Sequence, residues 1–445
     1  MIMRIIVWIV IVIWVIITAA GYLVSCAPLW ERLPRPPLLI GNSLTPTAAH
    51  SPAAMTALAL SPDWRQQAER VIDQVLENMH EHAWNAQAMT RGLRTGGLFI
   101  NWKMTDPRRI NAVHPDAQKG RQEKHDPQVD LLYLSALSAY QRLHPGITIY
   151  QADLQRTLAV VKFAFQNYNL PKGWIYFALL TLGLTLPDAS LLEEAHELAE
   201  RFYRFWYDPL AGTVYDRLHR PPDYNTAHTL ECGAALIDAG KRWQMPAWRE
   251  AGERTLQHII KMAFDPHRHL LHESMLAGST GHDQPQNDEV RAAAEGEAVT
   301  ALVLAYRLTG QSQYLALAGV LLRSLFVTSG LWDTQRGGFY FALRLSDGKV
   351  IQDYKETRAQ CLTVNGLHLY NAQAGAPFVS EERSLIALLL GPFYEHTYHG
   401  YFYRLSADFQ IYISKPGAGI GKEDYFTSEA MGCALNALFS VLLPS

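Results

Sequence analysis

Charged and polar residues stand directly before six strongly apolar segments of the sequence. They are Lys124-His125-Asp126, Lys172-Gly173-Trp174, Asp223-Tyr224-Asn225, Asp288-Glu289-Val290-Arg291, Lys355-Glu356-Thr357-Arg358 and Lys422-Glu423-Asp424-Tyr425. Hydrolysis of a glycosidic bond requires one protonated carboxyl group to donate a proton and one ionised carboxylate to activate water or to attack the sugar. If the six segments surround one axis, these acids ring one cavity and could supply that chemistry.

Four of these acids are the candidate catalytic residues: Asp126, Asp424, Glu423 and Glu356. Asp126 and Asp424 are favoured, because each belongs to a polar cluster and precedes an apolar segment. The residue types do not decide which acid donates the proton and which activates water. Helix capping is the competing interpretation for each single acid, since acids in a first helical turn bind its free N–H groups.

Candidate substrate-binding residues accompany the acids. Sugar rings can stack on aromatic faces, and the candidate platforms are Trp174, Tyr224, Tyr340 and Tyr401. Arg358 and His228 are the candidate polar contacts to the substrate.

Eight further polar side chains fall inside the apolar segments. They are Asp130, His228, Glu231, Glu295, Glu297, Asn365, His368 and Glu429. Because an unpaired buried charge is unfavourable, we expect these residues to bind one another, the backbone or a ligand. Glu295 and Glu297 are two residues apart and cannot share a helix face. We therefore expect one to point toward the axis and the other into a helix–helix contact.

Two alternatives to carboxyl chemistry involve histidine. His228 begins the third apolar segment, where a sugar epimerase would need a proton-transferring base, although a histidine satisfied within the core is the commoner case. The zinc-ligand residue types on these segments are Cys232, Cys361, Cys433, His228 and His368. Their spacing shows no local ligand pair, and small buried cysteines commonly just pack. We therefore expect neither a metal nor another cofactor.

Twelve helix-sized segments of two alternating kinds predict the fold. The first kind has one apolar stripe opposite charged positions, at 61–79, 152–168, 191–206, 247–264, 313–327 and 381–394. The second kind is apolar nearly all round and must be buried on both sides, at 129–140, 173–184, 227–239, 292–306, 361–370 and 428–439. This alternation predicts an all-α (α/α)6 toroid of six helical hairpins. Small residues such as Gly233 and Gly432 would let its inner ring pack closely.

The connections contain a second repeat. Aromatic-rich turns after four of the amphipathic segments, at 207–215, 264–272, 332–340 and 398–403, are typical of short β-hairpins on one rim. The 83–124 connection is far longer than a usual link between helices. We interpret it as a lid, with Trp102 as a wall residue.

In this alternation, and in the hairpin formed by Gly337-Gly338-Phe339-Tyr340, residues 61–443 resemble the six-hairpin (α/α)6-barrel superfamily. That superfamily includes glucoamylase-like, unsaturated-glucuronyl-hydrolase-like and endo-α-1,6-mannanase-like glycoside hydrolases, and the N-acylglucosamine 2-epimerases. The resemblance implies a substrate funnel at the N-terminal ends of the inner helices. It does not carry over catalytic roles: the adjacent acids Glu423-Asp424 lie in the last hairpin, without the rest of the endo-mannanase pattern.

The N-terminus predicts a membrane segment. Residues 5–23 are almost wholly apolar after the cation Arg4, and no further charge occurs before Glu31. Either a signal-anchor helix is retained, or a signal is cleaved at the lipobox-like Leu23-Val24-Ser25-Cys26. Both interpretations place the remaining chain on the extracytoplasmic face of a bacterial-type membrane. The predicted domains are 1–26 for this segment, 27–60 for a Pro-rich spacer and 61–445 for the barrel.

The charge composition excludes one class of binding partner. The net charge is −3, from 39 basic and 42 acidic residues, and the absence of a long basic stripe excludes nucleic acid as an expected partner. The four cysteines are too few for a disulfide scaffold and do not decide the redox compartment.

The expected function is that of a glycoside hydrolase acting on a poly- or oligosaccharide. A histidine-dependent sugar epimerase or isomerase and a non-catalytic glycan-binding scaffold are the alternatives.

Overall fold

The computed structural model of the protein describes residues 61–103, 126–186, 188–278, 282–412 and 425–443, all within one compact unit. The predicted membrane segment and spacer, residues 104–124 of the predicted lid, and the candidate residues Glu423 and Asp424 lie outside these ranges. Within them, no helix has both the length and the apolar character needed to cross a bilayer.

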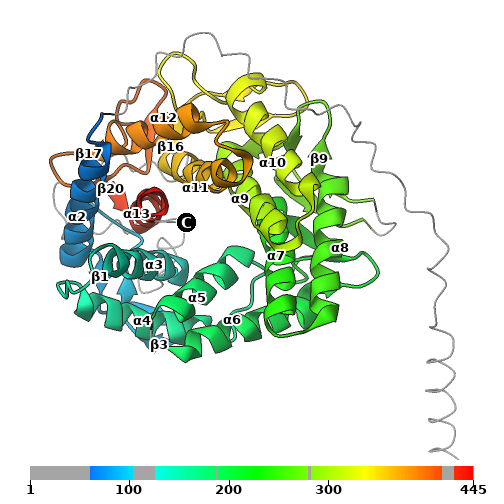
Figure 1. Ribbon diagram of the computed structural model, residues 1–445, viewed down its shortest axis with the longest axis horizontal. Helices are drawn as coiled ribbons and strands as arrows, with labels where there is room; N and C mark the ends of the chain where they lie inside the picture. The colour runs from blue at the N-terminus through cyan, green and yellow to red at the C-terminus, as the bar shows by residue number, and fades with distance from the viewer. Residues whose placement is uncertain (1–60, 104–125, 187, 279–281, 413–424, 444–445) are drawn as a thin grey trace, which may run out of the picture. The chain divides into compact units, whose positions relative to one another are not determined.

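Six helices form an inner ring (Figure 1). They are α3 (Pro127–Leu143), α5 (Gly173–Thr185), α7 (Thr226–Arg242), α9 (Ala292–Thr309), α11 (Thr357–Ala374) and α13 (Ser428–Leu442). Each packs against the next, and α13 packs against α3, so the ring closes. The predicted apolar segments are therefore the inner helices.

Six amphipathic helices surround this ring. They are α2 (Trp64–His82), α4 (Gln151–Phe165), α6 (Ala189–Arg201), α8 (Pro246–Ala263), α10 (Ser312–Arg323) and α12 (Val379–Leu390). Two of them continue into single π-helical turns, η2 (Phe202–Trp206) and η3 (Ser324–Thr328). Five outer helices pack on the inner helix that precedes them, whereas α2 packs on α13. The first and last described helices thus complete one hairpin.

Small residues bring the inner helices into close contact, as predicted. A Cβ atom on Gly173 of α5 would lie 2.1 Å from the carbonyl carbon of Glu231 on α7. A Cβ atom on Gly432 of α13 would lie 2.9 Å from the Cβ of Leu132 on α3. No side chain larger than hydrogen fits at these two positions without a shift of the neighbouring helix.

Short antiparallel strands lie in the connections between the helices. The predicted hairpins form as β6 (Tyr207–Asp208) with β7 (Thr213–Val214), β9 (Phe264–Asp265) with β10 (Leu270–Leu271), and β17 (Tyr394–Glu395) with β18 (Gly400–Tyr401). The fourth is a single bridge between Trp332 and Phe339. Within residues 84–98, β1 (Trp84–Asn85) pairs with β4 (Gly97–Leu98), and β2 (Met89–Thr90) with β3 (Leu93–Arg94).

Another set of strands leads directly into inner helices. These entry strands are β8 (Asp223–Asn225), β13 (Glu289–Arg291), β16 (Tyr354–Glu356) and β20 (Tyr425–Thr427). Their partners are β11 (Ser274–Leu276), β14 (Ala342–Arg344), β19 (Arg404–Ser406) and β5 (Asn101–Lys103). A third strand extends two of these sheets: β12 (Gln284–Pro285) pairs with β11, and β15 (Val350–Ile351) pairs with β14. Pairing of the entry strands fixes where the first turns of α7, α9, α11 and α13 begin.

The interpretation of Trp102 as a wall residue of a cavity is wrong. Trp102 lies in β5, is fully buried, and packs edge-on against Phe426 of β20 with ring centroids 6.3 Å apart. Pairing of β5 with β20 draws this indole into the core, because both strands bury that face against the inner ring.

Candidate active site

Each of the six inner helices contributes a charged or polar side chain at or near its N-terminal end. We call this group the central cluster; it consists of Asp126, Lys172, His228, Glu231, Glu297, Arg358 and Glu429. Contacts and electrostatic interactions link these residues around the ring. Ring closure therefore brings together groups that come from all six hairpins.

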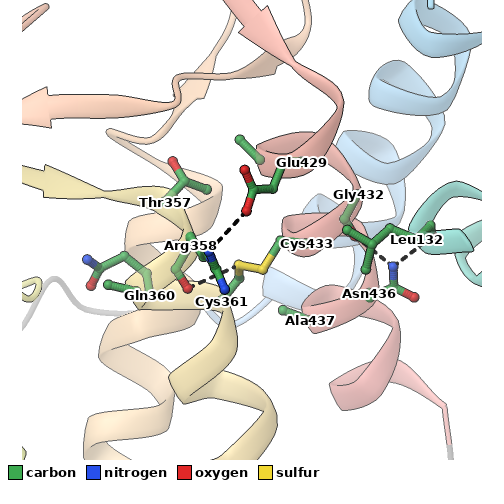
Figure 2. Close-up of a disulfide and its surroundings, with 12 residues drawn as sticks. Leu132, Thr357, Arg358, Gln360, Cys361, Glu429, Gly432, Cys433, Asn436 and Ala437 are labelled. Atoms are coloured by element: carbon green, nitrogen blue, oxygen red, sulfur yellow. Dashed lines mark hydrogen bonds and ion pairs between the residues drawn. A yellow bond between two sulfur atoms is a disulfide. The ribbon is translucent and has the colours of Figure 1, made fainter. Parts of the chain in front are cut away.

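Arg358, the second residue of α11, lies between two carboxylates. One of its terminal nitrogens is 3.0 Å from Glu297 Oε1. The other is 3.2 Å from Glu429 Oε1, a contact that Figure 2 shows. Burial disfavours the guanidinium charge, but Glu297 and Glu429 outweigh this and raise the pKa of Arg358. The side chains of Arg358 and Glu429 remain 30% and 38% exposed, so solvent and ligands can reach this pair.

Glu297 is held in its ionised form by its neighbours. Burial acts to raise its pKa, but the charge of Arg358 and the hydrogen bond from Arg358 hold that pKa below its ordinary value. Its second oxygen lies 3.8 Å from His228 Nε2. Burial lowers the pKa of His228 to about 4, so the imidazole is neutral near pH 7.

Glu231, on the neighbouring helix α7, has the opposite protonation behaviour. Burial, reinforced by the charge of Glu297, raises the pKa of Glu231 well above its ordinary value. Its Oε2 accepts a hydrogen bond from the backbone N–H of Trp174 at 3.1 Å. Glu231 therefore keeps its proton at pH values where Glu297 is ionised.

Asp126 and Lys172 complete the ring. Asp126 is the N-cap of α3 and accepts from the backbone N–H of Gln128 at 3.0 Å, which is the capping role considered above. Lys172 Nζ donates to the Gln128 side-chain oxygen at 2.8 Å, and burial lowers the pKa of this lysine. The contacts of the Asp126 carboxylate are with Gln128 in the first turn of its own helix. A catalytic role for Asp126 stays a prediction.

Glu356, the third candidate acid, lies beside the cluster. It ends β16, is nearly buried, and has one carboxylate oxygen 3.8 Å from a guanidinium nitrogen of Arg404. Burial raises its pKa, although the charges of Arg404 and Arg358 oppose this. Its side chain makes no capping hydrogen bond to α11.

The predicted aromatic platforms separate into two groups. Trp174 follows Lys172 at the start of α5, is partly exposed, and adjoins Glu231. The hydroxyl of Tyr224 donates to Asp283 at 2.8 Å, Tyr340 lies beside the buried Lys355, and Tyr401 is fully buried in the core. The predicted contact of Tyr401 with a sugar would require a face that the core covers, since β18 packs against α13.

Sequence reasoning missed Tyr403 as an aromatic neighbour of the cluster. Its carbonyl accepts from the N–H of Thr357, the first residue of α11, at 3.2 Å. Burial and the charges of Glu356 and Glu429 raise the pKa of its phenol to about 12. Its place in the aromatic-rich turn at 398–403 was the available signal.

The expected divergence of Glu295 and Glu297 is found. Glu297 faces Arg358 and His228, whereas Glu295 accepts from the backbone N–H of Leu271 at 2.8 Å. The contact of Glu295 is thus with strand β10 rather than with a helix. Burial raises the pKa of Glu295 to about 8.

The cysteines do not assemble a zinc site. Cys361 and Cys433 form a disulfide, so neither offers a thiolate, and Cys232 is a buried thiol whose pKa burial raises. His368 binds Glu382 at 2.9 Å. Elsewhere in the described chain, Asp216, His219 and Asp223 form a partly exposed group of potential cation ligands. One ligand atom from each lies within 4.8 Å of the other two.

The chain has the fold of an (α/α)6 toroid, and it is similar to solved structures of glycoside hydrolases and of a sugar isomerase. An unsaturated glucuronyl hydrolase from Bacillus sp. GL1 superposes with a TM-score of 0.60 at 15% identity, over 85% of this chain and 96% of its own. A D-mannose isomerase gives 0.58 at 15% identity, over 85% and 99%. The α-1,6-mannanase GH76A from Salegentibacter sp. HEL1_6 gives 0.55 at 14% identity, over 85% and 99%.

Neither a protein-family model nor a curated protein matches the chain. At such low identities the structural likeness establishes the fold, and the chemistry must be argued from the residues of the central cluster.

Proposed function

We propose that the protein is a glycoside hydrolase in which Glu231 is the general acid and Glu297 is the catalytic base or nucleophile. The observation that carries the proposal is the opposite displacement of two carboxyl pKa values on neighbouring inner helices. A raised and a lowered carboxyl pKa within one site is the arrangement that acid/base cleavage of a glycosidic bond requires.

The proposed reaction assigns one step to each carboxyl group. Glu231 transfers its proton to the glycosidic oxygen as the bond from that oxygen to the anomeric carbon breaks. Glu297 either removes a proton from the water that attacks the anomeric carbon or attacks it directly, with water releasing the sugar afterwards. Arg358 keeps Glu297 ionised through its 3.0 Å contact. The partly exposed Trp174, whose backbone N–H binds Glu231, is the proposed aromatic platform for the sugar.

Proteins of the same fold support this class of chemistry. The similar structures include unsaturated glucuronyl hydrolases and α-1,6-mannanases. One mannanase structure is of an inactive variant, in which two adjacent aspartates are replaced by asparagine, in complex with α-1,6-mannotriose. Carboxyl residues and an oligosaccharide thus occur together in a barrel of this architecture.

A sugar isomerase or epimerase is the second candidate. It is favoured by the position of His228, whose Nε2 lies 3.8 Å from Glu297, and by the D-mannose isomerase among the similar structures. Proton abstraction by His228 would require a base of near-neutral pKa, whereas burial lowers the pKa of this imidazole to about 4. Hydrolysis therefore fits the protonation states of the cluster better.

Product analysis distinguishes the candidates. We would incubate the purified protein with neutral and uronate-containing oligosaccharides and follow new reducing ends by mass spectrometry. Hydrolysis that is lost in Glu231→Gln is the expected result. Interconversion of sugars without new reducing ends, dependent on His228, would replace the hydrolase by an isomerase, and binding without conversion would indicate a glycan-binding scaffold.

We further propose that the protein acts outside the cytoplasm, attached through residues 1–26. The apolar run at 5–23 supports this location, and so does the Cys361–Cys433 disulfide, because disulfides persist mainly in oxidising compartments. Protease digestion of intact cells should degrade the barrel domain. A protected barrel in the soluble fraction would contradict the proposal.

A further inference from the structure

The disulfide and the Arg358–Glu429 ion pair both connect α11 to α13, in neighbouring turns of the two helices. Cys361 lies three residues after Arg358 on α11, and Cys433 lies four residues after Glu429 on α13. Residues three or four apart on a helix share a face. The disulfide, with its Cα atoms 6.0 Å apart, therefore lies about one turn below the ion pair (Figure 2).

Helix α13 closes the inner ring. It is the last described helix, and it packs on α11 to one side and on α3 to the other. On the α3 side, Asn436 Nδ2 donates to the carbonyl of Leu132 at 2.9 Å. On the α11 side the disulfide supplies a covalent bond between the two helices that present Arg358 and Glu429.

Glu429 can influence Glu297 because both carboxylates bind the guanidinium of Arg358. The guanidinium contacts Glu297 with one nitrogen and Glu429 with the other. If α13 moves away from α11, Glu429 withdraws and the guanidinium is free to rotate toward Glu297. The hydrogen bonding of the proposed base then changes without any direct change to that residue.

We propose that the Cys361–Cys433 disulfide is a positioning element of the active site, which holds Glu429 in register with Arg358 and thereby sets the orientation of Arg358 against Glu297. The inference rests on the proposed function only for its effect on turnover. Its structural part, that the bond holds the ion pair together, is independent of any substrate.

The presence of the bond is tested first. Thiols are counted in denaturant with and without prior reduction. Reduction should expose at least two additional thiols, those of Cys361 and Cys433. An unchanged count would overturn the proposal at once.

The coupling between bond and ion pair is tested next, without substrate. Glu429→Gln is introduced into the wild type and into the disulfide-free variant Cys361→Ala/Cys433→Ala, and the unfolding midpoint and hydrogen exchange of α13 are measured. We expect the substitution to lower the midpoint only where the disulfide is intact, and exchange in α13 to rise when it is absent. Equal effects of Glu429→Gln in both backgrounds would overturn the proposal.

Two matched controls accompany this cycle. Cys232→Ala removes the other described cysteine, which is buried and unbonded, and should leave the effect of Glu429→Gln unchanged. Glu273→Gln alters a different ion pair, in which Glu273 accepts from Arg291 Nε at 2.7 Å, and should have the same effect with and without the disulfide.

Turnover gives the final readout. Loss of the disulfide should lower kcat about 10- to 100-fold in the wild type, because small displacements of catalytic groups have effects of that size. It should have little further effect in Glu429→Gln. A loss of equal size in both backgrounds would reduce the disulfide to a general stabiliser, whereas absence of all turnover with an intact structural coupling would instead reject the hydrolase proposal.

Discussion

Glu231 and Glu297, on neighbouring inner helices, have pKa values displaced in opposite directions from a common starting point. Both side chains are largely removed from solvent, and Arg358 distinguishes them because its guanidinium donates a hydrogen bond to Glu297. The difference between the two carboxyl groups therefore arises from which one the guanidinium reaches.

Replacement of Glu231 should abolish turnover without unfolding the protein. The amide in Glu231→Gln can still accept the hydrogen bond from the Trp174 N–H but has no acidic proton to transfer. We expect kcat/KM to fall by about 10²- to 10⁴-fold. The control is Glu295→Gln, the same chemical change at a buried glutamate of α9 that faces Leu271, and it should retain full activity.

The pH dependence of kcat/KM should be bell-shaped. As pH rises through the elevated pKa of Glu231, the acid loses its proton and the rate falls. As pH decreases through the depressed pKa of Glu297, the carboxylate is neutralised and the rate also falls. In Arg358→Gln, the acidic limb should move to higher pH, because the charge that holds Glu297 ionised is gone; an unmoved limb would contradict this role.

Glu295 should make stability depend on pH. Its pKa rises from about 4.5 in the unfolded chain to about 8 in the folded protein, so the folded state binds more protons between these values. The free energy of unfolding should consequently fall by a few kcal/mol as pH increases from 4.5 to 8. Denaturant titrations should show that Glu295→Gln, which keeps an acceptor for the Leu271 N–H, removes most of this decline.

The disulfide should contribute strongly to stability as well as to position. It closes a loop of 72 residues, for which the loss of unfolded-chain entropy corresponds to about 4 kcal/mol. The variant Cys361→Ala/Cys433→Ala should show this loss in denaturant unfolding. Cys232→Ala, which opens no loop, should cost only about 1 kcal/mol; similar losses for both variants would argue against the entropic account.

Trp174 and Tyr401 should respond differently to truncation. Trp174→Ala removes a partly exposed ring from a residue whose backbone N–H binds Glu231, and it should raise KM for an oligosaccharide with little change in the unfolding midpoint. Tyr401→Ala empties a fully buried position and should cost about 3–5 kcal/mol of stability. Substrate binding measured on the folded fraction should stay normal for the Tyr401 variant; a weakened affinity would restore it as a sugar platform.

The sequence alone determined the order and nature of the helices. The apolar stripe of 61–79 became the outer helix α2, and the segment at 292–306, apolar all round, became the inner helix α9. Such patterns are local, since a helix presents residues three and four apart on one face regardless of its distant neighbours. The divergence of Glu295 and Glu297 followed from the same geometry.

Only the tertiary structure decided which distant groups meet. Sequence reasoning named Glu231, Glu297 and Glu429 as residues that need partners, yet favoured Asp126, which caps its own helix. The pairing of Cys361 with Cys433 could likewise not be predicted from the sequence, because the two cysteines lie 72 residues apart on different hairpins. Burial and pKa depend on distances between hairpins, and closure of the ring, rather than any local pattern, sets those distances.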